Sequence, residues 1–318
     1  MKPIIDMHNH TFLSACCNEK EATAGAFIDK AAEVGIQVLG ITNHCWDQKM
    51  PGSGAWYAPQ TVEWCMKIYD ELPEDTKGVK VFIGVESEYK GMTDEIGMSA
   101  EGAAKFDYVL IPHTHTHMTG FVIPYDRYLQ EAIDIMERRL REAFPEVSDR
   151  QIEKWMSQAR NPDVKKMVPE LKVDLEFGAK FMCDSFVSLL ENEEFNKIKD
   201  AVPTFVAHPF VAGGYSWTDA RKMLAMIPDE KFIEMFTLMA QKGVGYDISV
   251  NNFEVDNPEN CQMHRIARLA KQCGVKFLFG TDTHHIEGLE RADRSAKIFE
   301  NLGMTKEDLH PFFRDFVK

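Results

Sequence analysis

The sequence lacks any apolar run long enough to cross a membrane. No stretch approaches the roughly 18 consecutive apolar residues expected of a transmembrane helix, and the segment MKPIIDMHNH at 1–10 contains no apolar stretch of signal-peptide length. The sequence also lacks cysteine pairs in a CxxC pattern, and its seven cysteines are an odd number. This usage is typical of reduced thiols rather than of a disulfide framework. We therefore expect a cytoplasmic protein.

An excess of positive charge is missing as well. Lys and Arg number 36 against 50 Asp and Glu, which gives a formal net charge of −14. An acidic surface disfavours nucleic acid and anionic membranes as partners, because both bind proteins through positive charge. A small anionic substrate stays compatible with this charge if bound metal ions make the site locally positive. These features carry no indication of an oligomeric state.

Nucleotide-binding signatures are also absent, since neither GxGxxG nor GxxxxGK[ST] follows an apolar run. The chain has instead a series of short apolar runs that alternate with helical patterns. The seven runs are PIID at 3–6, QVLGIT at 37–42, VKVFIGV at 79–85, DYVLIP at 107–112, PTFVA at 203–207, GVGYDISV at 243–250 and VKFLFGT at 275–281. Continuous apolar strands between helices predict a parallel sheet covered on both faces. We expect one α/β domain over 1–318, a closed or nearly closed barrel rather than an open doubly wound sheet.

One connection in this pattern is far longer than the others. About ninety residues separate the fourth run from the fifth, whereas ordinary connections are short. Most of this segment has helical patterns, at 126–143, 148–160 and 163–190. We therefore expect a helical insertion over about 118–200. It is either a solvent-exposed helical hairpin or, because it leaves from the C-terminal end of a strand, a lid over the mouth of the barrel.

The histidines collect where the predicted strands end. His8 and His10 follow the first run, and positions i and i+2 of an extended chain point to the same side. Two imidazoles presented together suit a divalent metal ion, although an isolated pair would as readily be ordinary surface or core histidines. Of the eleven histidines, only His264 and His310 lie away from the C-terminal ends of predicted strands. Parallel barrels build their active sites at these ends.

Carboxylates join the histidines at the same strand ends. Glu86 follows the third run and Asp282 follows the seventh. The other candidates at strand ends are His44, His113, His208 and His284, with His115, His117 and His285 as weaker ones. So many donors exceed the needs of one tetrahedral ion and predict a site of two or three metal ions. His115 and His117 either contact a metal or the substrate, or they mark the loop that enters the insertion. Asp247 and Asn251, at the end of the sixth run, either contact substrate or form a polar turn.

Taken in order along the chain, these residues resemble the motifs of the PHP (polymerase and histidinol phosphatase) family of metal-dependent phosphoesterases. The matching segments are DMHNHT at 6–11, ITNH at 41–44, GVE at 84–86, His113, HP at 208–209 and GTDTH at 280–284. The resemblance implies a distorted (β/α)7, TIM-like barrel. It also implies ligands for three ions: His8, His10, Glu86 and Asp282 for the first, the bridging Glu86 with His113 and His208 for the second, and His44 and His284 for the third.

Two positions depart from the family's pattern. Asn43 stands where the second motif usually has Asp, so it can form hydrogen bonds but cannot supply negative charge around a metal. The loop FLSACCN at 12–18 offers Cys16 or Cys17, or no ligand at all, where the family has Asp or His. A thiolate there would favour zinc, and a missing ligand would leave the third ion the loosest of the three.

The expected chemistry follows from these charges. Two or three divalent ions, Zn, Mn or Fe, would lower the pKa of a bound water and make metal-bound hydroxide available as the nucleophile. Asp282 is the candidate general base, and the expected catalytic set also includes Glu86 and His284, with a histidine at the mouth protonating the leaving alkoxide. We expect a phosphoester hydrolase that acts on a small phosphorylated metabolite and is similar to histidinol phosphatases.

Three alternatives stay open at this point. A nuclease or phosphodiesterase would need a basic groove, which the net charge of −14 does not indicate. A hydrolase of carbon–nitrogen bonds is compatible with the same residues, because barrel sites with a bridging hydroxide also cleave amides. The non-enzymatic alternative is a metal-binding domain without turnover, which the near-complete set of ligands disfavours.

Overall fold

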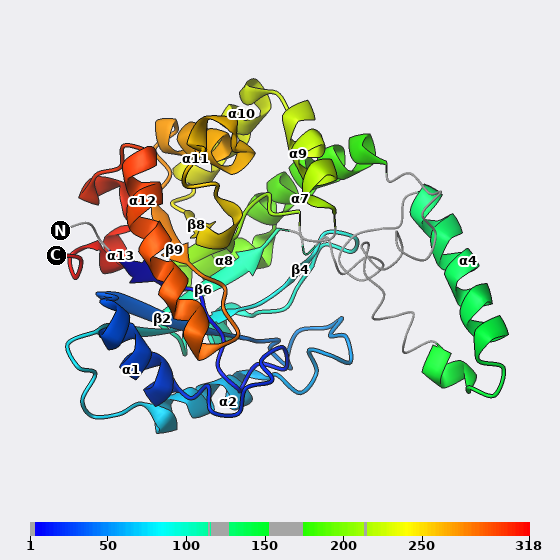
Figure 1. The fold of residues 1–318 in the computed structure, drawn as a ribbon, viewed down its shortest axis with the longest axis horizontal. Coiled ribbons are helices and arrows are strands. Elements are labelled where there is room, and N and C mark those ends of the chain that lie inside the picture. Colours follow the sequence, from blue (N-terminus) through cyan, green and yellow to red (C-terminus); the bar gives the residue numbers. More distant parts are fainter. Residues whose placement is uncertain (1–3, 114, 116–126, 153–173, 213–214) are drawn as a thin grey trace.

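The centre of the fold is a sheet of seven parallel strands in the order β1-β2-β3-β6-β7-β8-β9. Figure 1 shows the fold of the chain, with the elements labelled where there is room. The computed structural model describes residues 4–113, 115, 127–152, 174–212 and 215–318. The strands are β1 (Ile5–Asp6), β2 (Val38–His44), β3 (Lys80–Glu86), β6 (Tyr108–Pro112), β7 (Thr204–Ala207), β8 (Gly245–Ser249) and β9 (Phe277–Gly280). Each of them overlaps one of the seven apolar runs of the sequence, because a strand buried on both faces needs apolar side chains at successive positions.

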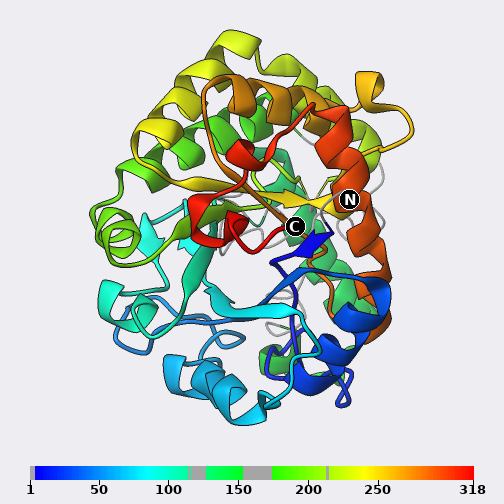
Figure 2. The ribbon, with the colours of Figure 1, turned by 90° about the vertical axis from the view of Figure 1, so that its left-hand side faces the viewer.

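The first and last strands meet, so the sheet forms a nearly closed barrel. The backbone N–H of Met7 donates to the carbonyl of Phe279 at 2.7 Å, and the N–H of Asp282 donates to the carbonyl of His8 at 2.7 Å. Figure 2 shows the strands at the centre of the molecule with helices around them. The predicted parallel α/β barrel is confirmed. Its closure lies at two of the residues that sequence analysis placed in the metal site.

Helices join the strands and cover the outside of the barrel. The helices between successive strands include α1 (Ala24–Val34), α2 (Val62–Cys65), η1 (Met66–Glu71), α9 (Trp217–Met226), α10 (Asp229–Gln241) and α11 (Gln262–Gln272). Shorter or later elements are α3 (Ala100–Ala103), η2 (Val250–Asn252), η3 (Pro258–Asn260), η4 (Ile286–Asp293), α12 (Arg294–Asn301), η5 (Lys306–Asp308), α13 (Pro311–Arg314) and a hairpin of β4 (Tyr89–Lys90) and β5 (Glu95–Ile96). No helix of the described residues combines the length and the apolar character that a membrane span requires.

Helix α1 shows how the local sequence sets these boundaries. The hydroxyl of Thr23 accepts a hydrogen bond from the backbone N–H of Ala26, which satisfies one of the free donors at the start of the helix. Gly35 ends the helix in the left-handed region, at φ 81°, which costs glycine little. Between these two caps, Phe27 and Ile28 are buried beneath the helix and attach it to the barrel.

The long connection after β6 contains α4 (Arg127–Ala143), α7 (Leu175–Glu191) and α8 (Glu193–Ala201). Helices α7 and α8 pack on the barrel, where Phe186 and Phe195 are fully buried, whereas α4 lies apart from them in Figure 1. Residues 116–126 and 153–173 lie outside the described residues, and so does His117. A lid function for the insertion, and its boundaries at about 118–200, therefore stay predictions.

A tyrosine inside the barrel restrains the chain that leads into the site. Tyr108 is fully buried, and its hydroxyl donates to the carbonyl of Met7 at 2.6 Å. A Cβ added at Gly40 would lie 2.0 Å from this hydroxyl, and one added at Gly84 would lie 2.7 Å from the ring. Glycine at both positions therefore makes room for the tyrosine. Because β1 has only two residues, this hydrogen bond fixes the backbone directly before His8.

We predict that Gly84→Ala destabilises the fold by about 1–3 kcal/mol, the usual cost of overpacking a filled core. The free energy of unfolding from chemical denaturation measures this effect. Gly25→Ala is the matched control, because Gly25 lies in α1 and an added Cβ there meets only the Thr23 hydroxyl, at 3.9 Å; it should be neutral or slightly stabilising. Equal stability of the two variants would show that the Tyr108 ring does not fill the space beside Gly84.

Candidate metal centre

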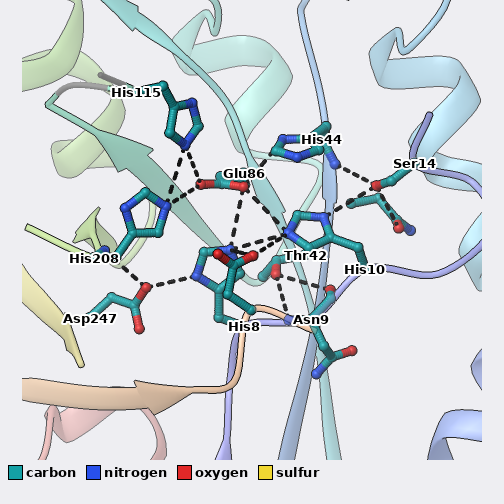
Figure 3. A network of polar contacts seen from close by, with 12 residues as sticks. His8, Asn9, His10, Ser14, Thr42, His44, Glu86, His115, His208 and Asp247 are labelled. Atoms are coloured by element: carbon teal, nitrogen blue, oxygen red, sulfur yellow. Dashed lines mark hydrogen bonds and ion pairs between the residues drawn. The ribbon is translucent and has the colours of Figure 1, made fainter. Parts of the chain in front are cut away.

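Histidines and carboxylates from several strand ends converge at the C-terminal mouth of the barrel (Figure 3). His44 and Glu86 are the last residues of β2 and β3, and His208 directly follows β7. His8 and Asp282 each lie two residues beyond the end of their strands, β1 and β9. Because all these strands run in the same direction, their C-terminal residues share one face of the barrel. The structure brings these five residues together at one end of the barrel, as the sequence predicted.

The first donor group consists of His8, His10, Glu86 and Asp282. His8 Nε2 lies 3.4 Å from Glu86 Oε2 and 3.6 Å from Asp282 Oδ1. His10 Nε2 lies 3.4 Å and 3.2 Å from the same two oxygens, and 3.3 Å from His8 Nε2. A tetrahedral zinc ion with bonds of about 2.0–2.1 Å holds its ligand atoms about 3.3–3.4 Å apart. The four side chains therefore already have the spacing that one ion requires.

The second donor group uses the other oxygen of the same carboxylate. Glu86 Oε1 lies 3.1 Å from His208 Nε2 and 3.5 Å from His115 Nε2, and the two imidazole nitrogens are 3.4 Å apart. These three distances form one face of a coordination shell of the same size. Glu86 thus has Oε2 in the first group and Oε1 in the second, the geometry of a bridging carboxylate.

The structure differs from the expected ligand set at His113, which lies outside the second donor group. Its Nε2 accepts a hydrogen bond from the backbone N–H of Phe210 at 2.9 Å, and its carbonyl accepts one from the Ser185 hydroxyl at 2.8 Å. Its ring contacts Phe186 of α7, with 5.3 Å between the ring centroids. Burial lowers the pKa of His113 to about 3, so the imidazole is neutral, and its Nε2 lone pair is already engaged by the Phe210 N–H. His115, a weaker candidate in the sequence, takes its place.

The third donor group contains Cys16, His44 and His284 together with His10, whose donor atoms all lie within 4.8 Å of one another. The rings of His44 and His284 stack on His10, with centroid distances of 4.4 Å and 4.6 Å. Of the two cysteines in the preceding loop, Cys16 is the one in this group. His285 lies outside all three groups, and its ring is 69% exposed.

Hydrogen bonds to carboxylates orient the imidazoles. His8 Nδ1 pairs with Asp247 Oδ2 at 2.7 Å, and the same oxygen accepts the backbone N–H of His208 at 3.1 Å. His115 Nδ1 pairs with Glu88 Oε2 at 2.6 Å. In each case the pairing leaves Nε2 directed toward Glu86, which is how carboxylates commonly fix the orientation of metal-binding histidines. This role of Asp247 was not expected; the available signal in the sequence was a carboxylate inside the apolar run at 243–250.

Two asparagines near the site, Asn43 and Asn251, hold the backbone in place by hydrogen bonds. Asn43 Oδ1 accepts hydrogen bonds from the Thr11 backbone N–H at 2.8 Å, the Thr11 hydroxyl at 3.1 Å and the Ser14 hydroxyl at 3.0 Å. It therefore holds the loop after His10 without supplying charge. Asn251, in η2 directly after β8, donates to the carbonyl of Thr281 at 2.6 Å, which ties η2 to the segment before Asp282.

The electrostatics of the cluster favour ionised carboxylates, and the surrounding imidazoles differ in the direction of their pKa shifts. Burial alone would raise the pKa of Glu86, but His8 and His44 hold it well below its ordinary value. Burial lowers the pKa of His44 far below its ordinary value and that of His284 to about 4, so both imidazoles are neutral near pH 7, the form that binds metals. Burial, helped by Glu86 and Asp282, raises the pKa of the Cys16 thiol well above its ordinary value. A thiol in this position needs a nearby cation to ionise.

Two of the site residues have a strained backbone. His208 has φ 29° and Asp282 has φ 51°, both in the left-handed region that disfavours residues with a Cβ. Such conformations cost of order 1–3 kcal/mol and persist where the surrounding structure holds them in place. Here the hydrogen bonds from His208 N–H to Asp247 and from Asp282 N–H to the His8 carbonyl hold them. The strain directs both side chains into the donor groups.

The fold and the site together define a parallel α/β barrel whose mouth has a carboxylate shared between two groups of imidazoles. No protein-family model matches the chain. The chain is 24% identical over 313 residues to a probable phosphatase from Thermoanaerobacter sp. (strain X514) and, to the same extent, to a probable phosphatase from Thermoanaerobacter pseudethanolicus (strain ATCC 33223 / 39E). Both matches cover 96% of this chain and 89% of the relative.

Two solved structures have a more distant likeness. The histidinol phosphate phosphatase of Lactococcus lactis subsp. lactis Il1403, complexed with zinc, L-histidinol and phosphate, is 16% identical with a TM-score of 0.49, over 95% of this chain and 94% of that one. The catalytic domain of beta-amylase from Paenibacillus polymyxa is 9% identical with a TM-score of 0.38, over 96% and 91%. Because both TM-scores are low and the two names describe different enzymes, neither likeness carries an argument about function.

We predict that Glu86→Gln removes more than one metal ion per chain, because an amide has lost the charge and one of the two ligand oxygens that the bridge uses. Elemental analysis after loading with zinc or manganese and gel filtration measures the metal content. Glu101→Gln is the control, since Glu101 is 72% exposed in an ion pair with Lys49. Full metal content in Glu86→Gln would exclude a bridging role.

We also predict that His115→Gln weakens metal binding whereas His113→Gln does not. Glutamine cannot replace the imidazole nitrogen as a ligand. Loss of a hydrogen-bond partner around a metal site lowers the metal affinity by about 10–100-fold, and loss of a ligand in the second donor group should lower it by at least as much. At position 113 the glutamine amide can still accept the Phe210 N–H, and metal titration should match the wild type. The reverse result would restore His113 to the ligand set.

Proposed function

We propose that this chain is a metal-dependent phosphatase of the PHP type, which hydrolyses the phosphate ester of a small metabolite. Its similarity to probable phosphatases extends over almost the whole chain and supports the proposal. The observation that carries it is Glu86, whose two oxygens belong to two different donor groups. A carboxylate between two such groups is typical of two-metal sites that act on phosphate esters.

The donor groups fit two or three divalent ions of zinc, manganese or iron. Imidazole and carboxylate ligands suit all three metals, and His44 Nδ1 is a buried atom without a hydrogen-bond partner in the described structure. The first group contains two carboxylates, Glu86 and Asp282, whose negative charge repels an anionic ester, so binding of the ester requires added positive charge. Bound divalent ions would supply that charge at the phosphoryl oxygens and lower the pKa of a bound water toward neutrality.

The carboxylates of the site have different roles because they differ in exposure. Glu86 is 1% exposed and is surrounded by imidazoles, so it holds ions and does not reach substrate. Asp282 is 33% exposed, and the neighbouring His8 and His10 outweigh burial and hold its pKa below the ordinary value. It is therefore ionised near pH 7 at the mouth, where a general base has to accept a proton from the attacking water. His284, neutral near pH 7, serves as a ligand rather than as a proton donor.

The substrate of this proposal is a monoester of a small molecule rather than a nucleic acid. The formal net charge of −14 opposes a polyanionic backbone, whose affinity for proteins comes largely from contacts between basic side chains and phosphates. A small monoester needs only the local charge of the metal centre. Two other functions are possible for the same residues: cleavage of a carbon–nitrogen bond, and metal binding without turnover. Activity toward a monoester, a diester and an amide distinguishes them from a phosphatase.

We predict that the manganese- or zinc-loaded protein hydrolyses p-nitrophenyl phosphate with a higher kcat/KM than bis(p-nitrophenyl) phosphate, and leaves p-nitroanilides intact. A chelator should abolish the activity, and added metal should restore it. Asp282→Asn should lower kcat by about 100-fold or more, the usual contribution of a general base, whereas Glu101→Gln should keep full activity. Faster cleavage of the diester or of an amide, or no cleavage at all with any of the three metals, would contradict the proposal.

A further inference from the structure

The loop that follows His10 places one thiol at the metal centre and directs the next one away from it. Cys16 lies in the third donor group, within 4.8 Å of donor atoms of His44 and His284. The thiol of Cys17 instead donates to the His284 carbonyl at 3.1 Å, and Cys17 is buried. Adjacent cysteines therefore have different surroundings, and only Cys16 is available as a ligand.

The fold fixes the position of Cys16 from both sides. The preceding Ser14 accepts a hydrogen bond from the backbone N–H of His44 at 2.9 Å, and the N–H of Ala15 donates to Gln60 Oε1 at 2.8 Å. On the other side, the backbone N–H of Cys17 donates to the Ser14 carbonyl at 3.0 Å. The thiol is thus held by a tight, anchored turn directly beside His44.

A second, independent observation points to a ligand in this group. His44 is 7% exposed, and its Nδ1 makes no hydrogen bond within the described structure, although Glu86 Oε2 lies 3.2 Å away. A buried polar atom without a partner is costly and calls for an explanation such as an unseen ion. A metal ion coordinated by the His44 ring would supply such a partner.

His10 belongs to both the first and the third donor group, and its contacts assign it to the first. His10 Nε2 already occupies a corner of the first donor group, at 3.2 Å from Asp282 Oδ1. The third group then retains Cys16, His44 and His284, that is, one sulfur and two nitrogens. Three protein ligands with an open fourth position are typical of exchangeable or catalytic zinc sites, and a sulfur ligand selects zinc over the harder manganese.

We propose that Cys16 supplies a thiolate ligand to the third metal position, which the resemblance assigns to His44 and His284, and makes that position selective for zinc beside a Glu86-bridged pair with only nitrogen and oxygen ligands. Binding converts the thiol to a zinc thiolate and releases one proton to solvent, with no change of oxidation state. The proposal builds on the proposed function, because it adds a metal of different preference to the same centre. A chain loaded with both metals would hold zinc here while manganese can occupy the pair.

Cobalt substitution tests the sulfur ligand without any assay of activity. Cobalt(II) replaces zinc, and a cobalt–thiolate bond gives charge-transfer absorption in the near ultraviolet that nitrogen and oxygen ligands do not produce. The wild-type chain, loaded with cobalt(II) under reducing conditions, should show this band. Cys16→Ser should lose it and keep the visible bands of the pair, and the matched control Cys17→Ser should keep it. A full cobalt content without the band, or a band that disappears with Cys17→Ser and not with Cys16→Ser, would overturn the proposal.

Alkylation of the wild-type chain gives a second test that does not depend on the folding of a variant. Zinc should protect Cys16 from iodoacetamide at least tenfold in rate, as measured by peptide mass spectrometry, whereas manganese at the same concentration should not. Equal reactivity with both metals would overturn the selectivity. Cys16→Asp should retain a third ion but shift its preference from zinc toward manganese. A cobalt–thiolate band in a protein that hydrolyses no ester would uphold this site and refute the phosphatase, and phosphatase activity without the band would do the opposite.

Discussion

The buried carboxylate of Glu86 is the interaction on which the rest of the site depends. A charged carboxylate that is removed from water costs several kcal/mol unless opposite charge and hydrogen bonds compensate it. Glu86 is 1% exposed and lies within 3.1–3.5 Å of nitrogens from five imidazoles, those of His8, His10, His44, His115 and His208. In the absence of ions, this compensation raises the pKa of His8 and lowers that of Glu86. Metal ions between the same atoms would supply the positive charge instead.

The closed barrel brings the residues around Glu86 to one place. The imidazoles come from strands that are far apart in the sequence, and only parallel strands that close on themselves carry all their C-terminal ends to one mouth. The short strand β1 is the weakest part of this arrangement, since it has two residues, and the hydrogen bond from Tyr108 to Met7 restrains it directly before His8. The strained backbones of His208 and Asp282 then direct two more donors inward. Packing deep in the barrel therefore helps to set the positions of the donor atoms at its mouth.

Much of this could be predicted from the sequence, and the exceptions have physical causes. Buried parallel strands appear as apolar runs, and donors directly at their ends, such as Glu86 and His44, need no further information to be placed. The resemblance favoured His113 over His115, whereas the structure places His115 in the second donor group. Both follow β6, and the choice depends on contacts of His113 with Ser185 and Phe186 in a distant helix. Cys16 and Cys17 could not be separated for a similar reason, since a turn rather than a strand sets their directions.

The most direct test of the shared carboxylate is anomalous diffraction from crystals of the metal-loaded chain, recorded at the absorption edges of zinc and manganese. We expect two anomalous peaks on either side of Glu86, about 3.5–4 Å apart as in other two-metal sites, with one carboxylate oxygen on each. A single peak, or two peaks that both lie away from Glu86, would contradict this expectation.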